Sequence, residues 1–190
     1  MLGLMPTERP RRRPRLAARE TRARILDAAL VTFSAKGYAQ CLISDIADAA
    51  DVSSALVMQH FHTKAALFEE ALSSALDEIA ASAADNDFAE LMTGVLRDDV
   101  RAHRARLMLV HSIGAEEVRQ IASKLVHERL IAPLTKLGGE PHGFERAAMA
   151  VALAVGYATL GMLIPAKRGK LGNKQLVGKM IGETLQAMAA

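Results

Sequence analysis

The apolar residues of this 190-residue chain recur three and four positions apart, and no convincing stretch alternates them in the way of a β-strand. In residues 26–33, for example, the apolar side chains Leu26, Ala29, Leu30 and Phe33 form one stripe of a helix. The composition agrees, because the chain has 35 alanines, no tryptophan and only 4% aromatic residues. The sequence therefore predicts an all-α fold of about nine helices.

The net positive charge of the chain comes from its first 24 residues. Residues 1–24 contain eight arginines and two glutamates, whereas the whole chain has a formal net charge of only +3. Three prolines interrupt this segment, and no sustained apolar face accompanies them. We therefore predict a disordered basic arm at residues 1–18. An arm of this charge calls for an anionic partner, unless it is a functionless solvated tail.

Glycines, prolines and polar links divide the rest of the chain into helices. Gly37 follows Lys36 and is typical of a helix C-terminus. Pro133 should kink or shorten the helix that contains it, because proline removes a backbone donor. The predicted helices lie at residues 20–36, 43–50, 54–60, 64 onward, 88–101, 104–113, 116–137, 144–163 and 174–188.

Two short helices with a tight link between them are predicted in residues 43–64, which read ISDIADAADVSSALVMQHFHTK. Their spacing matches that of a helix-turn-helix motif. Ala47 is small where the second helix must cross closely, and Asp51 occupies the turn, where a positive φ is often required. Ser53 is placed to cap the helix that would enter the major groove.

The order of these parts resembles the N-terminal domain of TetR-family transcriptional regulators. The resemblance covers residues 21–72 and rests on TRARILDAALVTFSAKGY, Asp45-Ile46-Ala47, Val52-Ser53, His60-Phe61 and Lys64. It implies an all-helical C-terminal domain, a homodimer that binds double-stranded operator DNA, and a small-molecule pocket. We accordingly expect a helix-turn-helix DNA-binding domain at residues 19–63 and an effector-binding and dimerisation domain at residues 64–190.

The resemblance also implies which residues contact DNA. Ser54, Ala55 and Gln59 fall where family members read base edges, and other positions fall where phosphates are held, among them Ser53, His60 and Lys64. The full set expected at the DNA is Arg19, Arg22, Ser44, Ser53, Ser54, Ala55, Met58, Gln59, His60 and Lys64.

The sequence departs from the family pattern at three positions of the helix-turn-helix segment. Leu42 stands where a threonine usually caps the second helix and touches phosphate, so Asp45 lacks its capping-box partner. Met58 replaces a frequent phosphate-binding tyrosine, and Asp51 replaces a frequent glycine in the turn. Each loss weakens the electrostatic contact with DNA, and the arginines of the basic arm would restore it.

The C-terminal half offers candidates for an effector pocket and a dimer interface. The candidate pocket residues are Met92, Arg104, Met108, His111, Met149 and Tyr157. Each of them also fits simple packing in the core. Dimerisation is expected to use the last two helices, through Ala152, Gly156, Gly161, Ile181 and Leu185. Because the available side chains are mostly aliphatic, the effector is expected to be a small apolar molecule.

The sequence gives no support for catalysis, a metal site or a cofactor. It has no GxSxG, no nucleotide-binding fingerprint and no ligand cluster to complete His60-x-His62. The single cysteine, Cys41, fits a packing role in a reducing cytoplasm. Residues 147–166 carry no charge, but seven are alanines, which favours a buried helix over a membrane span.

We therefore expect a cytoplasmic, non-enzymatic transcription regulator, in the form of a repressor that a small apolar effector releases from its operator. One alternative is an effector-independent DNA-binding protein of chromosome organisation, which would show little operator preference. A second alternative is an enzyme that has kept the same helical scaffold.

Overall fold

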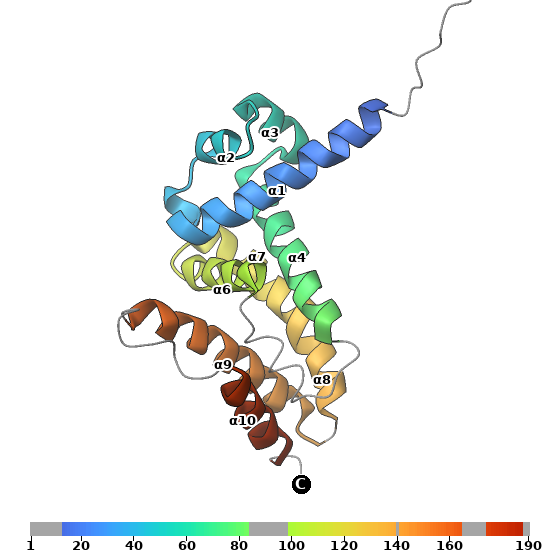
Figure 1. Cartoon of the computed structure of the whole chain (residues 1–190), viewed down its shortest axis with the longest axis vertical. Coiled ribbons are helices and arrows are strands. Elements are labelled where there is room, and N and C mark those ends of the chain that lie inside the picture. Colours follow the sequence, from blue (N-terminus) through green and yellow to red (C-terminus); the bar gives the residue numbers. More distant parts are fainter. Residues whose placement is uncertain (1–12, 84–98, 140, 165–173, 188–190) are drawn as a thin grey trace, which may run out of the picture.

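The computed structural model describes residues 13–83, 99–139, 141–164 and 174–187 (Figure 1). These residues are mostly helical and contain no strand, which confirms the all-α expectation. Their elements, in chain order, are α1 (Arg13–Gln40), α2 (Ile43–Ala49), α3 (Ser54–Phe61), α4 (Lys64–Ala83), α6 (Val100–Ser112), α7 (Glu116–Val126), the π-helical turn η1 (His127–Ile131), α8 (Ala132–Gly138), α9 (Gly143–Leu163) and α10 (Lys174–Ala187).

Helix α1 is longer at both ends than the sequence predicted. It begins at Arg13, so residues 13–18, which we expected in the basic arm, are helical. Pro14 falls in the first turn, where a missing backbone donor leaves no hydrogen bond unmade. At Gly37 the backbone leaves helical geometry, with φ of 74° and ψ of 164°, but a further helical turn reaches Gln40. Gly37 is therefore a kink near the end of α1, not its last residue.

Helices α1 to α4 share one large core with α6 and α7. Three aromatic rings meet in this core, those of Phe33 and Tyr38 of α1 and of Phe68 of α4. The ring centroids are 5.9 Å apart for Phe33 and Tyr38, 5.4 Å for Phe33 and Phe68, and 5.6 Å for Tyr38 and Phe68. Two of the three ring pairs meet edge to face, which is a favourable arrangement of aromatic quadrupoles. Helix α6 contributes the fully buried Met108 to the same core. The helix-turn-helix segment and the start of the C-terminal half are thus held by one set of contacts.

A second, smaller core joins η1 and α8 to α9. Ile131 and Leu134 pack there against Ala147 and Ala150 of α9, with Ile181 of α10 at the edge. Helix α9 also meets α6, where Val155 packs against the larger core. Its outer face exposes large apolar side chains, namely those of Phe144, Met149, Leu153, Leu160 and Leu163. Within the described ranges, no helix has the length and apolar character to cross a membrane.

The predicted disruption at Pro133 takes the form of a π turn. The segment predicted as one helix at residues 116–137 runs as α7, η1 and α8. The backbone N–H of Ala132 donates to the carbonyl of His127, five residues earlier, instead of four. Pro133 has no N–H, and its ring crowds the carbonyl four residues before it. The wider turn that precedes it accommodates both effects without ending the helix.

The break predicted between residues 101 and 104 is absent. Residues 100–112 form the single helix α6, because Asp99 caps its start. The Asp99 carboxylate accepts hydrogen bonds from the backbone N–H of Arg101, at 2.8 Å, and of Ala102. Most of the helix predicted at residues 88–101 lies outside the described residues.

We predict that Gly37→Ala lowers the free energy of unfolding by about 1–3 kcal/mol. A Cβ at this position would have room, since its nearest neighbour is Cβ of His111 at 3.5 Å, so the cost comes from the backbone conformation. Gly114→Ala is the matched control, because a Cβ there meets nothing within 4 Å. Urea unfolding of both variants should show a loss for Gly37→Ala alone, and equal stabilities would contradict the argument.

Candidate nucleic-acid interface

Helices α2 and α3 form the helix-turn-helix at the end of the molecule away from α9 and α10 (Figure 1). Ile46 and Ala47 of α2 are buried against Val57 and Phe61 of α3, and the small side chain of Ala47 permits a close crossing. Asp51 in the turn has a φ of 53°, which confirms the positive φ expected there. The turn and this crossing thus set the angle between α2 and α3.

The first turn of α3 is capped as predicted. The Ser53 hydroxyl accepts a hydrogen bond from the backbone N–H of Leu56 at 3.2 Å. Beyond the cap, Ser54, Ala55, Met58 and Gln59 are exposed, whereas the opposite side of the helix is buried. Helix α3 therefore presents one full side to solvent, as a helix that enters the major groove must do.

The start of α2 has half of a capping box. The backbone N–H of Leu42 donates to the Asp45 carboxylate at 2.9 Å, but the Leu42 side chain has no oxygen to accept the return bond. Asp45 also lies 2.8 Å from the Lys36 ammonium. Lys36 first, and then the Leu42 backbone, lower the pKa of the Asp45 carboxyl. Leu42 itself is 61% exposed, close to the exposed hydroxyl-bearing Ser44.

Lys64 opens α4 beside the same surface. Its ammonium lies 4.3 Å from the ring centroid of Tyr38, a cation–π contact that holds it close to α1. The preceding Thr63 caps α4, because its hydroxyl accepts from the backbone N–H of Ala66 at 3.0 Å. The sequence predicts a break between residues 60 and 64, and the signal for the cap that was missed is a threonine directly before a helix.

The arginines of α1 differ in their surroundings. Arg22 forms an ion pair with Glu70 of α4, and its guanidinium carbon lies 4.9 Å from the ring centroid of Phe61. Arg24 donates to the carbonyl of Asp51 at 3.4 Å, whereas Arg19 is exposed. Arg22 thus already has partners that join α1 to α3 and α4.

The expected DNA-contacting residues lie on neighbouring elements, and most of them are exposed. Those from α2, α3 and the start of α4 follow one another around the helix-turn-helix, and His60 is half-buried among them. Arg19 and Arg22 lie on α1, which passes beside α3 (Figure 1).

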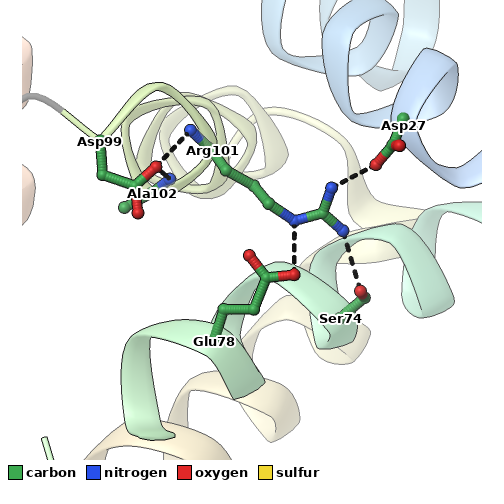
Figure 2. A network of polar contacts seen from close by, with 6 residues as sticks. All are labelled: Asp27, Ser74, Glu78, Asp99, Arg101 and Ala102. Atoms are coloured by element: carbon green, nitrogen blue, oxygen red, sulfur yellow. Dashed lines mark hydrogen bonds and ion pairs between the residues drawn. The ribbon is translucent and has the colours of Figure 1, made fainter. Parts of the chain in front are cut away.

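A polar network that the sequence did not reveal joins α6 to α1 and α4. Figure 2 shows Arg101 of α6 between these two helices. Its guanidinium pairs with Asp27 of α1 and lies 2.9 Å from both the Ser74 hydroxyl and the Glu78 carboxylate of α4. Asp27 and Arg101 are 74 residues apart in the sequence, so no local sequence pattern predicts their contact. The network connects α1 and α4, which flank the helix-turn-helix, directly to α6.

Two further contacts meet the C-terminal end of α1. His111 of α6 lies against Gly37, and its Nδ1 atom is buried without a hydrogen-bond partner among the described residues. The pKa of Tyr38 is raised by burial and then by a hydrogen bond to Glu117 at the start of α7. The end of α1 is therefore sensitive to the position of α6 and α7.

The candidate pocket residues differ in burial. Met108 is fully buried in the larger core, whereas Met149 is exposed on α9. Arg104 is half-buried on α6, Tyr157 is half-buried on α9, and burial raises the pKa of Tyr157. Met92 lies outside the described residues.

The candidate dimer residues lie on α9 and α10. Ala152, Gly156 and Gly161 are exposed on α9, and Ile181 is half-buried against the smaller core. A Cβ at Gly156 would meet nothing within 4 Å. Leu185 lies in α10.

No group of three or more potential metal ligands occurs in the part of the chain that the structure describes. Cys41 is fully buried beneath the helix-turn-helix. Burial, partly offset by Lys64 and Lys36, raises the pKa of its thiol to about 11. A protonated, buried thiol packs as a small apolar group.

We predict that Leu42→Thr raises the free energy of unfolding by about 0.5–2 kcal/mol, because the new hydroxyl would complete the capping box with Asp45. Leu42→Val is the matched control, since valine has the shape of threonine without its oxygen. Thermal unfolding of the two variants measures the difference. The same midpoint for threonine and valine would show that the cap contributes nothing here.

The helix-turn-helix segment matches a known protein family. Residues 25–71 match the family model of bacterial regulatory proteins of the tetR family. No match is found among curated proteins. The matched segment runs from the middle of α1 to α4 and contains the whole helix-turn-helix.

Solved structures share the fold of nearly the whole chain. A candidate TetR-family transcriptional regulator from Rhodococcus sp. is 16% identical with a TM-score of 0.73, over 90% of this chain and 100% of that one. A transcriptional regulator from Rhodococcus sp. Rha1 is 20% identical with a TM-score of 0.69, over 88% and 96%. FadR from Bacillus subtilis, solved in complex with stearoyl-CoA, is 16% identical with a TM-score of 0.65, over 87% and 97%.

Two findings now agree, since the sequence of residues 25–71 matches one family and the described helices superpose on solved regulators. Residues 25–71 are thus similar to the tetR family of bacterial regulatory proteins, and the fold around them is one that solved structures of transcriptional regulators share.

Proposed function

We propose that this protein is a sequence-specific DNA-binding transcription regulator, and that it acts as a homodimeric repressor released by a small apolar effector. The observation that carries the proposal is the exposed side of α3. The first turn of this helix is capped by Ser53, and its opposite side is buried in the core. Such a helix has the size and orientation for the major groove. In this assignment residues 19–63 bind DNA, and residues 64–190 form the effector-binding and dimerisation domain.

The proposed contacts with DNA divide by chemistry. The exposed side chains of Ser54, Ala55 and Gln59 face base edges, while Ser53 and Lys64 lie at helix starts, where phosphates bind. Ser44 and His60 adjoin the phosphate-binding positions. The arginines of residues 1–24 add the non-specific electrostatic attraction that α3 does not provide.

The exposed apolar face of α9 supports dimerisation with a second copy of the chain. Leu153, Leu160 and Leu163 remain exposed there, and α10 adds Leu176 and Met180. A single chain would leave this large apolar surface in water, which is unfavourable. The exposed Gly156 and Gly161 of α9 would allow the helices of two copies to approach closely.

The contacts of α6 support a route from effector to DNA. Helix α6 meets α1 through Arg101 and Asp27 and through His111 and Gly37, so a shift of α6 would turn the helix-turn-helix. An effector that prefers the shifted conformer would lower operator affinity by the difference in its affinity for the two conformers. FadR of Bacillus subtilis, a protein of the same fold, is solved with stearoyl-CoA, and the apolar acyl chain of that ligand is consistent with an effector that has an apolar part.

We predict that the full chain enriches a pseudo-palindromic site from a random DNA pool. The two half-sites should be about one helical turn apart, roughly 34 Å, because a dimer places its two α3 helices in successive major grooves. Sequencing of the bound DNA measures the enrichment. The matched control is Gln59→Ala. Because the Gln59 side chain is exposed, the variant should fold normally, but it lacks one proposed contact with a base.

Three outcomes separate the possible functions. Enrichment that Gln59→Ala weakens supports a sequence-specific regulator. Binding without any enriched sequence supports the alternative in chromosome organisation. No binding at all, with a normally folded dimer, overturns the proposed function.

A second prediction concerns the basic arm. Deletion of residues 1–12 removes three arginines and leaves α1 intact. The deletion should weaken DNA binding and reduce the slope of log K against log salt by up to about 0.9 for each phosphate that the arm no longer neutralises. Replacement of the same three arginines by glutamine keeps the length and should give the same result. An unchanged slope would show that the arm does not touch DNA.

A further inference from the structure

The exposed side of α3 offers DNA no positive charge. Its solvent-facing side chains are those of Ser54, Ala55, Met58 and Gln59, and residues 53–61 contain no lysine or arginine. Lysine and arginine are the residues that most often bind the two acceptors of guanine in the major groove. Direct reading of G·C pairs by α3 is therefore disfavoured.

The cations next to α3 belong to other helices and already have contacts within the protein. Arg22 pairs with Glu70 and lies over the ring of Phe61. The Lys64 ammonium lies over the ring of Tyr38. These contacts hold both charges beside α3 and not along its exposed side, which suits the DNA backbone and not base edges.

Two of the four exposed side chains of α3, those of Ala55 and Met58, are instead apolar. Met58 and Gln59 follow Ala55 by three and four residues, so the three side chains share one side of the helix. Met58 is 37% exposed, although the adjoining Val57 is fully buried. Thymine supplies a matching apolar group in the major groove, its C5-methyl, and a glutamine amide matches the N6 and N7 of adenine.

We propose, on the basis of the proposed function, that Met58 and Ala55 read thymine methyl groups and that Gln59 reads adenine, so that α3 selects A·T base pairs. Met58 stands where the TetR-family resemblance implies a phosphate contact. In this chain it is instead a specificity-determining residue, because a thioether gives a phosphate no hydrogen-bond donor.

The test uses DNA that the full chain selects from a random pool. Each thymine of the enriched half-site is replaced in turn by deoxyuridine, which removes the C5-methyl and leaves every hydrogen-bonding group in place. Loss of a methyl that packs against Met58 or Ala55 should raise Kd roughly four-fold. Thymines outside the half-sites serve as internal controls.

Two variants assign the effect to a side chain. Met58→Gln has nearly the same length but a polar end, so it should lose the deoxyuridine penalty at one position. Met58→Leu keeps an apolar side chain and should retain that penalty. Because Met58 is exposed, both variants should fold, and circular dichroism of their helices checks this.

The failures of the two proposals are distinguishable. If no sequence is enriched, the proposed function fails. If a site is enriched but no deoxyuridine substitution changes Kd, or if α3 selects G·C pairs, the thymine-methyl proposal is overturned and the proposed function stands. A penalty that persists in Met58→Gln would assign the methyl packing to another residue and also overturn the role of Met58.

Discussion

The burial of α1 between two sets of helices is the constraint on which the rest of the structure depends. Ile25, Ala29 and Phe33 are fully buried, and even polar positions of this helix lie inside. Thr32 donates its hydroxyl to the carbonyl of Ala28 at 2.8 Å, so burial leaves no unsatisfied group there. Because α2, α4 and α6 all pack on α1, the direction in which α3 projects is set by how α1 lies against α6.

This arrangement separates the attraction of DNA from the reading of its sequence. Positive charge is concentrated before and along α1, whereas α3 presents small, apolar and amide side chains. Electrostatic attraction acts at long range and does not distinguish sequences, but contacts with base edges act at short range and do. The neutral exposed side of α3 would therefore contribute little to binding at the wrong sequence.

Local features of this fold were predictable from the sequence, and long-range ones were not. The positive φ of Asp51 and the cap at Ser53 follow from the preferences of single residues. Gly37 was expected to end its helix, and it does leave helical geometry, although a further turn follows it. The pairing of Arg101 with Asp27 depends on how helices cross, and a helical period shows only which side of a helix is apolar. The start of α1 was not predictable in this way, because Pro14, which suggests a break, is tolerated in a first turn.

The π turn before Pro133 makes this part of the chain intolerant of inserted or deleted residues. In an unbroken α-helix, Ile131 and Leu134 would lie on the side opposite Ala122 and Leu125, because each residue turns the helix by about 100°. The π turn changes this relation, so that one helical rod packs α7 into the larger core and α8 into the smaller one. Loss of one residue here would rotate α8 by roughly a quarter turn and carry Leu134 away from α9. Insertions and deletions that a loop absorbs are thus excluded from this loop-free connection.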